Sequence, residues 1–428
     1  MDNCYGDSSA SSPRRVAAPL YAACVLNGIL CLPLPLAAAD VLGWKIELLE
    51  TPAAVNEAAG NGAAGNGAAV PATVAQPRYR LLAPSDSPPH RVVLVGTRTE
   101  CEQRRLDELR RIHGTGFANL RVPTFGGKQF WADEFVFAGW RIQRGVLTGH
   151  YRLLDDRDVR HAWGSYESCR VTFEEQRLHR QLRHRSEHVV VLLHGLVRSK
   201  DCMSKLESDL EGAGYATVAV NYPSTRAPLA EHAAQVAQVL DRLGGAKQVS
   251  FVVHSLGGLV VRTLLARQGD AWRERMQVQR VVMLAPPSNG SAIADVLAPQ
   301  GWFEPLLGAA AAATTAETAG LPVPSCEFAV IAGGTGSTIG KNPLLSGDND
   351  GLLRVATTRL PGGAFLRVNA RHRKILDDPR ARAATLRFLA SGVLEAPAAS
   401  SVADGAPSEG RQTEDTAPET ESQRRVKL

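Results

Sequence analysis

Between residues 188 and 392, short apolar runs alternate with longer segments of mixed polarity. The runs have the length and β-branched content of buried strands, and the segments between them repeat apolar residues at the spacing of one helix face. The predicted strands are residues 189–193, 217–220, 249–253, 278–284, 328–332 and 365–368, and the predicted helices are residues 200–213, 229–243, 256–267 and 379–389. This alternation predicts an α/β fold with a mostly parallel sheet and helices on both faces.

The preceding stretch is less regular and rich in aromatic residues. Its predicted elements are a buried strand at 91–96, a helix at 100–113, a β-rich module at 126–154 and a polar helix at 162–184. We therefore expect a smaller N-terminal α+β region, whose role the residues do not indicate.

Low-complexity segments flank these parts. Residues 51–76 are mostly Ala, Gly, Asn and Pro, and the C-terminal tail is similarly poor in large apolar residues. Such segments bury too little apolar surface to offset the entropy of ordering them. The expected organisation is a short segment and flexible linker at 40–76, the α+β region at 77–187, the α/β domain at 188–392 and a disordered tail at 393–428.

The N-terminus has the pattern of an export signal. Arg14 and Arg15 precede an apolar run over 16–36, which ends in three alanines. These features predict a signal peptide over 1–39, and hence export to the periplasm, the cell envelope or the outside. A retained membrane anchor, with association at a membrane surface, is the alternative.

Charge and cysteine spacing exclude several classes of function. The net charge of +5 is mild and the arginines are scattered, which argues against a nucleic-acid partner. The cysteines beyond the signal lack metal-ligand spacing, so no metal or cofactor is expected; they could form one or two disulfides or remain free. These cysteines are Cys101, Cys169, Cys202 and Cys326.

Candidate chemistry is concentrated around Ser255. The predicted strand before it ends in His-Ser-Leu-Gly-Gly and leads directly into a helix. Such a turn presents a serine hydroxyl above the end of a sheet, and the helix N-terminus favours negative charge there. The elbow pattern Gly-x-Ser-x-Gly is incomplete, because Val253 replaces the first glycine. We expect Gly257 and Gly258 to supply the room that the valine needs.

A serine nucleophile needs a base and a carboxylate that orients the base. In one recurring arrangement the chain order is serine, acid, histidine. His372 is the only histidine after Ser255, which makes it the candidate base. Asp350, followed by Gly351, is the preferred acid, and Asp348 is the alternative. The Asp-x-Asp-Gly run lacks the other ligands of a calcium loop.

Two backbone amides would complete the site as an oxyanion hole. Leu256 follows the candidate nucleophile, and Leu196 lies in the loop after an early strand. The two residues are the expected donors. His194, in the same loop, precedes the serine and is expected to shape the loop rather than act as the base.

Taken together, these motifs resemble an α/β-hydrolase of the lipase and esterase type, similar to bacterial lipases and lipase-like GPI-inositol deacylases. The resemblance covers residues 188–392, and the region from 40 to 187 matches no family that its residues indicate. The resemblance rests on His194-Gly195-Leu196, His254-Ser255-Leu256-Gly257-Gly258, Ala285-Pro286-Pro287-Ser288-Asn289-Gly290-Ser291, Asn349-Asp350-Gly351-Leu352 and His372. It implies hydrolysis of a carboxylic ester through an acyl-enzyme on Ser255, with Asp350 and His372 as the other members of a catalytic triad.

A long excursion at 289–324 carries Trp302, Phe303 and an alanine run at 309–313. In this fold such an insertion commonly caps the site, which suggests a small-molecule or lipid ester with an apolar acyl group as substrate. A structural loop packed on the domain is the alternative. Two other functions also remain open, namely acyl transfer to an alcohol and a non-catalytic envelope protein.

Overall fold

The computed structural model describes residues 38–50, 77–85, 89–114, 119–183, 186–290 and 315–395. Residues 1–37, most of the expected linker and the tail from 396 lie outside this set, so the signal peptide, the linker and the tail stay predictions. The described residues pack as two units, which divide after Glu108.

The first unit contains a four-stranded antiparallel sheet and most of the helix α1 (Arg98–His113). Its strands, in order across the sheet, are β1 (Ala38–Val41), β2 (Trp44–Glu50), β3 (Arg78–Leu82) and β4 (Val92–Gly96). The predicted buried strand at 91–96 exists, but its burial is wrong. Val92 and Val95 are more than 40% exposed, because β4 forms an edge of the sheet.

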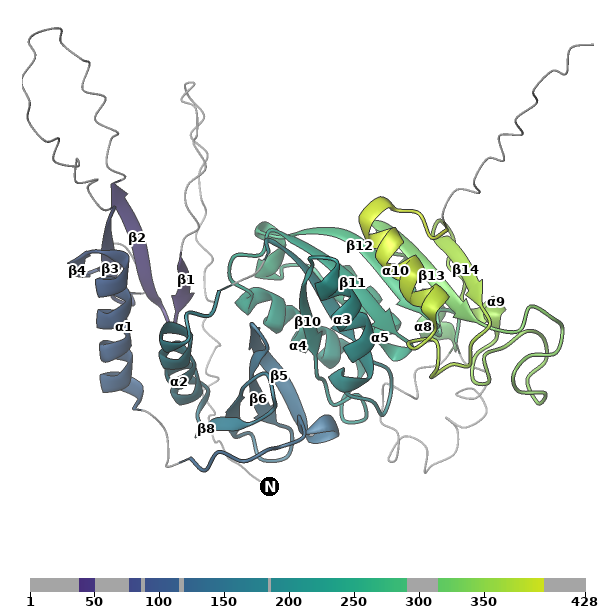
Figure 1. Ribbon diagram of the computed structural model, residues 1–428, viewed down its shortest axis with the longest axis horizontal. Coiled ribbons are helices and arrows are strands. Elements are labelled where there is room, and N and C mark those ends of the chain that lie inside the picture. The colour runs from purple at the N-terminus through teal and green to yellow at the C-terminus, as the bar shows by residue number, and fades with distance from the viewer. Residues whose placement is uncertain are drawn as a thin grey trace, which may run out of the picture. The chain divides into compact units, whose positions relative to one another are not determined.

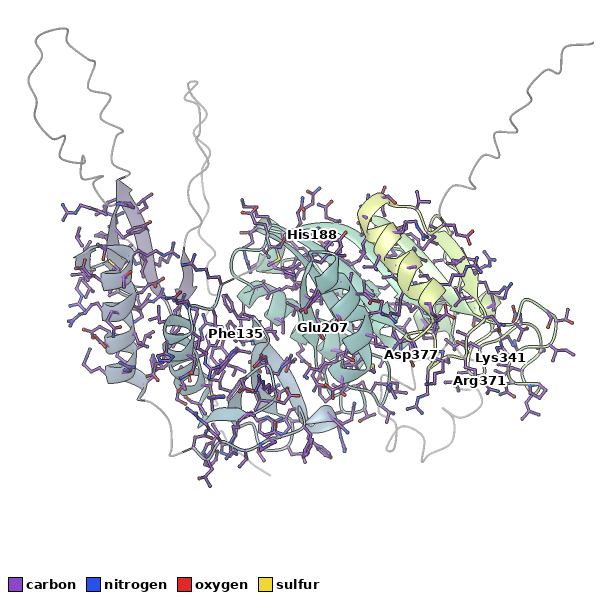
Figure 2. All side chains as sticks on the ribbon, in the orientation of Figure 1. Phe135, His188, Glu207, Lys341, Arg371 and Asp377 are labelled. Atoms are coloured by element: carbon purple, nitrogen blue, oxygen red, sulfur yellow. The ribbon has the colours of Figure 1, made fainter. Side chains whose placement is uncertain are left out.

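The second unit begins at Leu109, within α1, and we call its residues 119–183 the β5–β8 module. A 3-10 turn η1 (Lys128–Phe130) leads into a four-stranded antiparallel sheet, and a helix follows it. The elements are β5 (Trp131–Phe137), β6 (Trp140–Gly145), β7 (Tyr151–Leu154), β8 (Arg160–Gly164) and α2 (Tyr166–His179). Phe135, labelled in Figure 2, meets Phe173 of α2 edge to face, with ring centroids 4.8 Å apart.

The predicted β-rich module at 126–154 is therefore confirmed, whereas the polar helix predicted at 162–184 begins too early. Residues 160–164 form β8 and pair with β7. The helix starts only after Ser165, whose side chain accepts a hydrogen bond from the amide of Ser168 and caps the first turn.

The rest of the unit is built on a six-stranded parallel sheet, as predicted (Figure 1). Across the sheet the order is β10, β9, β11, β12, β13, β14. The strands are β9 (His188–Leu193), β10 (Ala216–Val220), β11 (Gln248–His254), β12 (Gln277–Leu284), β13 (Glu327–Gly333) and β14 (Ala364–Val368). Because every strand is parallel, all their carboxyl ends lie at one edge of the sheet, where sites form in such folds.

Helices cover both faces of this sheet. Two apolar clusters divide the residues of β9: Val189, Val191 and Leu193 join one cluster, and Val190 and Leu192 join the other. The first cluster includes α4 (Leu229–Arg242) and α5 (Leu256–Ala266), and the second includes α3 (Ser204–Gly212) and α10 (Pro379–Ser391). Shorter helical turns are η2 (Lys200–Met203), η3 (Ala271–Glu274), α8 (Thr315–Gly320) and α9 (Val355–Thr358).

Packing does not divide the chain at residue 187, where the sequence suggested a boundary. A buried polar network joins the β5–β8 module to the parallel sheet. Asp133 accepts hydrogen bonds from Arg141 at 2.6 Å and from the amide of Asn221, just after β10, at 2.7 Å. The side-chain amide of Asn221 donates to the carbonyls of Lys128 and Trp131, both at 2.8 Å. Buried hydrogen bonds therefore connect the β5–β8 module to the parallel sheet.

Replacement of Asp133 should destabilise this unit strongly. The Asp133→Ala change leaves the guanidinium of Arg141, whose side chain is only 7% exposed, without its closest carboxylate. Breaking a buried pair in this way typically costs about 3–5 kcal/mol of unfolding free energy, which urea denaturation would measure. Asp156→Ala, at an exposed carboxylate of the same module, is the control and should change the value by less than about 0.5 kcal/mol. Equal effects of the two substitutions would contradict the role of the network.

Candidate functional site

Ser255 forms the sharp turn between β11 and α5. Its backbone has φ 53° and ψ −119°, which is neither helical nor extended. The amide of Ser255 donates to the carbonyl of Leu284, at the end of β12, at 2.9 Å. A non-glycine residue in this strained conformation needs support from its surroundings. The turn places the half-buried side chain beyond the carboxyl ends of the strands.

The two glycines after the turn allow close packing of α5. A Cβ atom on Gly257 would lie 2.8 Å from the carbonyl oxygen of Leu193, and one on Gly258 would lie 2.7 Å from Cβ of Pro286. The glycines thus let α5 approach the end of β9 and the loop after β12. Val253 is fully buried in the apolar cluster that includes α4 and α5, whereas the nearest neighbours of the two glycines belong to β9, β12 and the loops that follow these strands.

The structure brings His372 and Asp350 to Ser255. Nε2 of His372 lies 2.9 Å from Oγ of Ser255, and Nδ1 of His372 lies 2.7 Å from Oδ2 of Asp350. The two residues come from the loops after β14 and β13. The His372 amide donates to the Asp350 carbonyl at 2.9 Å, which joins the loops. Both side chains are buried, which shields the Asp350–His372 hydrogen bond from water.

The loop around Asp350 leaves one carboxylate oxygen for the histidine. Oδ1 accepts from the amides of Leu352 at 2.9 Å and Leu353 at 2.7 Å. Gly351 has φ +103°, in the region that favours glycine, and lets the chain turn back for these contacts. Oδ2 remains directed at Nδ1 of His372.

Asp348, the alternative acid, has other partners. Its oxygens accept from the amides of Thr335 at 2.6 Å and Gly336 at 2.9 Å, and its carboxylate lies 3.9 Å from Arg367. These contacts anchor the loop after β13. Between the two aspartates, the geometry thus favours Asp350 as the partner of His372.

His254 has a role that the sequence did not reveal. Its Nε2 lies 3.1 Å from the carbonyl oxygen of His372, to which it donates a hydrogen bond. Burial, with the neighbouring His372 as a smaller cause, lowers the pKa of His254 to about 3, so the ring stays neutral near pH 7. The residue before Ser255 therefore holds the backbone of the candidate base.

The loop after β9 lies against Ser255. A Cβ on Gly195 would be 3.1 Å from Cβ of Ser255, so the loop backbone passes directly beside the serine. Leu196 follows in this loop, and Leu256 is the first residue of α5, where an amide has no acceptor within its own helix. Both expected donors thus lie on segments that adjoin Ser255.

His194 is held inside the loop, as its position before Ser255 suggested. Its Nδ1 lies 2.9 Å from the carbonyl oxygen of Gly195, and its Nε2 accepts from the amide of Tyr222 at 3.3 Å. The ring also stacks on Tyr222, with centroids 4.2 Å apart. Burial lowers the pKa of His194 to about 4. These contacts use both ring nitrogens.

The loops after β13 and β14, which carry Asp350 and His372, are also joined at the surface. Figure 2 labels Lys341 and Arg371 on these two loops, and the ammonium of Lys341 donates to Oδ1 of Asn369 at 2.5 Å. This contact ties the loop of Asp350 to the loop of His372 at the surface.

The expected cap lies largely outside the described residues, since 291–314 are not among them. Both ends of the excursion meet α5 through the buried Arg262. Its guanidinium donates to the carbonyls of Ser288 at 3.0 Å and Pro322 at 3.2 Å, and to that of Leu321. The base of the excursion is therefore fastened to the helix that follows Ser255.

The described residues hold no cluster of His, Cys, Asp and Glu suited to a metal ion. Within the same ranges, no helix has the length and apolar character needed to cross a membrane. The cysteines predicted to be either paired or free are free thiols, and Cys101 and Cys169 are buried.

Comparison with known proteins identifies the fold. Residues 188–323 match a family described as the alpha/beta hydrolase fold, which confirms the resemblance at the level of the fold. No curated protein matches the sequence.

Solved structures with some similarity include the metagenomic carboxyl esterase MGS0156, at 23% identity over 44% of this chain and 64% of that chain, with a TM-score of 0.34. Phospholipase PlaB from Legionella pneumophila is 18% identical over 40% of this chain and 45% of that one, with a TM-score of 0.31. Esterase RhEst1 from Rhodococcus sp. ECU1013 is 18% identical over 48% and 90%, with a TM-score of 0.30. The chain spans less than two thirds of the first two proteins.

Buried neutral histidines should make the unit sensitive to acid. Burial lowers the pKa of His194 and His232 to about 4 and that of His254 to about 3, well below the value of about 6.5 in an unfolded chain. Between these values the unfolded state binds protons that the native state does not, so stability is full above pH 6.5 and falls as the pH falls toward 4. Urea denaturation should show a loss approaching about 4 kcal/mol per pH unit near pH 5 from the three rings together.

His232→Gln isolates one of these rings. The variant should take up about one proton fewer on unfolding at pH 5, as measured from the pH dependence of the unfolding free energy. An unchanged proton uptake would show that His232 is already charged in the native protein.

Proposed function

From its α/β-hydrolase fold and the geometry around Ser255, we propose that this chain is a serine hydrolase that cleaves carboxylic esters. Ser255 is the nucleophile, His372 the general base and Asp350 the orienting carboxylate. The observation that carries the proposal is the continuous line from Oγ of Ser255 to Nε2 of His372 at 2.9 Å, and from Nδ1 to Oδ2 of Asp350 at 2.7 Å.

In the acylation step, Nε2 of His372 removes the hydroxyl proton as Oγ of Ser255 attacks the ester carbonyl. The carbonyl oxygen becomes an oxyanion, which the amides of Leu196 and Leu256 stabilise. When the tetrahedral intermediate collapses, His372 returns the proton to the leaving alkoxide. The products are an alcohol and an acyl group on Ser255.

Water completes the cycle. His372 takes a proton from a water molecule, the resulting hydroxide attacks the acyl carbonyl, and the proton then passes to Oγ of Ser255 as the carboxylic acid leaves. Throughout, Asp350 accepts from Nδ1–H and so keeps Nε2 free to act as a base. The amides of Leu352 and Leu353 support its charge on the other oxygen.

The proposed substrate is an ester with an apolar acyl group. Its support is the sequence of the excursion at 289–324, which carries Trp302, Phe303 and a run of alanines, and whose ends are fastened to α5. With the signal pattern at 1–39, this gives an exported esterase acting on small-molecule or lipid esters.

Loss of the nucleophile tests the reaction. Ser255→Ala should lower kcat for p-nitrophenyl butyrate by at least about 10³-fold while circular dichroism stays unchanged, because the acyl-enzyme cannot form. A fluorophosphonate probe should label the parent protein and not the variant. Equal turnover by the two proteins would refute the proposal, and formation of butyrate esters from added alcohols would identify acyl transfer instead.

A matched pair of substitutions tests the acid. Asp350→Asn should lower kcat by about 10⁴-fold, because an amide in place of the carboxylate favours the wrong tautomer of His372. Asp348→Asn, two positions away and bonded to Thr335 and Gly336, should retain kcat within about tenfold. The reverse order of effects in steady-state kinetics would assign the role to Asp348.

A further inference from the structure

We infer that Gln129, in the β5–β8 module, is a positioning residue for the loop that supplies the Leu196 amide. This loop, residues 194–199, is called the oxyanion loop below. The inference rests on the proposed function and gives the β5–β8 module a part in it.

Gln129 uses both ends of its side-chain amide. Its Nε2 donates to the carbonyl of Arg198, inside the oxyanion loop, at 2.6 Å. Its Oε1 accepts from the amide and the hydroxyl of Thr225, both at 3.0 Å, and from the hydroxyl of Ser224 at 3.2 Å. One side chain therefore connects the oxyanion loop to the segment after β10.

Ser224 links Gln129 to Val197, the residue that follows Leu196. The hydroxyl of Ser224, which is fully buried, donates to Gln129 and accepts from the amide of Val197 at 3.0 Å. Since the Val197 amide belongs to the peptide unit that follows Leu196, this contact limits rotation of the loop next to the proposed donor.

The oxyanion loop needs such support. Val197 is β-branched and has φ +57°, a strained conformation that persists only where neighbouring contacts impose it. Its side chain is 54% exposed, so burial of that side chain supplies little of the restraint. A turn hydrogen bond from the amide of Arg198 to the carbonyl of Gly195 at 3.2 Å supplies part of it, and the hydrogen bonds with Gln129 and Ser224 supply the restraint from outside the loop.

A second contact ties the same two parts together. The ammonium of Lys200, just after the oxyanion loop, lies 3.0 Å from a carboxylate oxygen of Asp158 in the β5–β8 module. The module thus holds the loop near Arg198 and again at Lys200. An oxyanion donor acts by being aimed before the charge develops, so loosening these contacts should weaken binding of the transition state more than binding of the substrate.

Gln235 on α4 provides a matched control. Like Gln129, it is half-buried and bridges the β5–β8 module to the sheet, since its side-chain amide donates to the carbonyls of Asp133 at 2.9 Å and Asn221 at 3.1 Å. Neither of these bonds reaches the oxyanion loop. Replacing either glutamine by methionine removes bridging hydrogen bonds while the side-chain volume stays similar. Only the replacement of Gln129 removes a hydrogen bond to the oxyanion loop.

The experiment compares Gln129→Met and Gln235→Met with the parent protein, using p-nitrophenyl butyrate and an alkyl boronic acid that forms a tetrahedral adduct with an active serine. Gln129→Met should lower kcat by about 10- to 100-fold with KM within about threefold, and should weaken boronic acid inhibition by a similar factor. Both methionine variants should lower the thermal midpoint of unfolding by similar amounts. Gln235→Met should nevertheless leave kcat within about threefold of the parent value.

Gln129→Glu provides the test if the methionine variant does not fold. The carboxylate can still accept from Ser224 and Thr225, but it cannot donate to Arg198 and places an acceptor oxygen against that carbonyl. The contact with the oxyanion loop is therefore lost, so kcat should again fall while KM is retained. Equal kcat in the Gln129 and Gln235 variants, with Ser255→Ala inactive, would overturn the inference and leave the proposed function standing. Full activity of Ser255→Ala would instead refute the proposed function.

Discussion

The position of Ser255 depends on how closely α5 can approach the end of β9. That approach requires the absence of a side chain at Gly257, where a Cβ would press on the carbonyl oxygen of Leu193. Because β9 and β11 are neighbours in the sheet, the loop after β9 passes beside the serine once the helix is in place. Tight helix packing therefore sets both the strained turn and the distance to the oxyanion loop, and the remaining parts of the site are arranged around these two features.

The sequence predicted the parallel sheet well because its strands are buried on both faces and read as continuous apolar runs. It was less informative for strands with one exposed face. Residues 162–164 belong to β8 (Arg160–Gly164), although the sequence predicts that a polar helix begins at residue 162. The apolar run at 92–96 lies at a sheet edge, so its composition overstated its burial. In both cases pairing with a neighbouring strand, which no single segment encodes, decided the structure.

Some residues of the candidate site could likewise be predicted from the sequence, and others could not. Ser255, Asp350 and His372 could be predicted because the order of residue types along the chain restricts the choice, and the structure brings the three together. Gln129 could not, because it meets Arg198 across 69 positions of sequence and carries no motif. His254 stands within the motif itself, yet its contact with the His372 carbonyl depends on where a loop 118 positions away returns. Residues that position others are recognisable only once the fold is known.

The separation of Ser255 from His372 also bears on how the protein is made. The two residues are 117 positions apart, and β12, β13 and β14 all lie between them in the chain. Such distant contacts form only after the intervening loops have closed, which places them late in folding. During synthesis the serine emerges well before its base, so a nascent or prematurely ended chain carries a nucleophile with nothing to activate it. The proposed activity therefore arises only when nearly the whole domain has been synthesised and has folded.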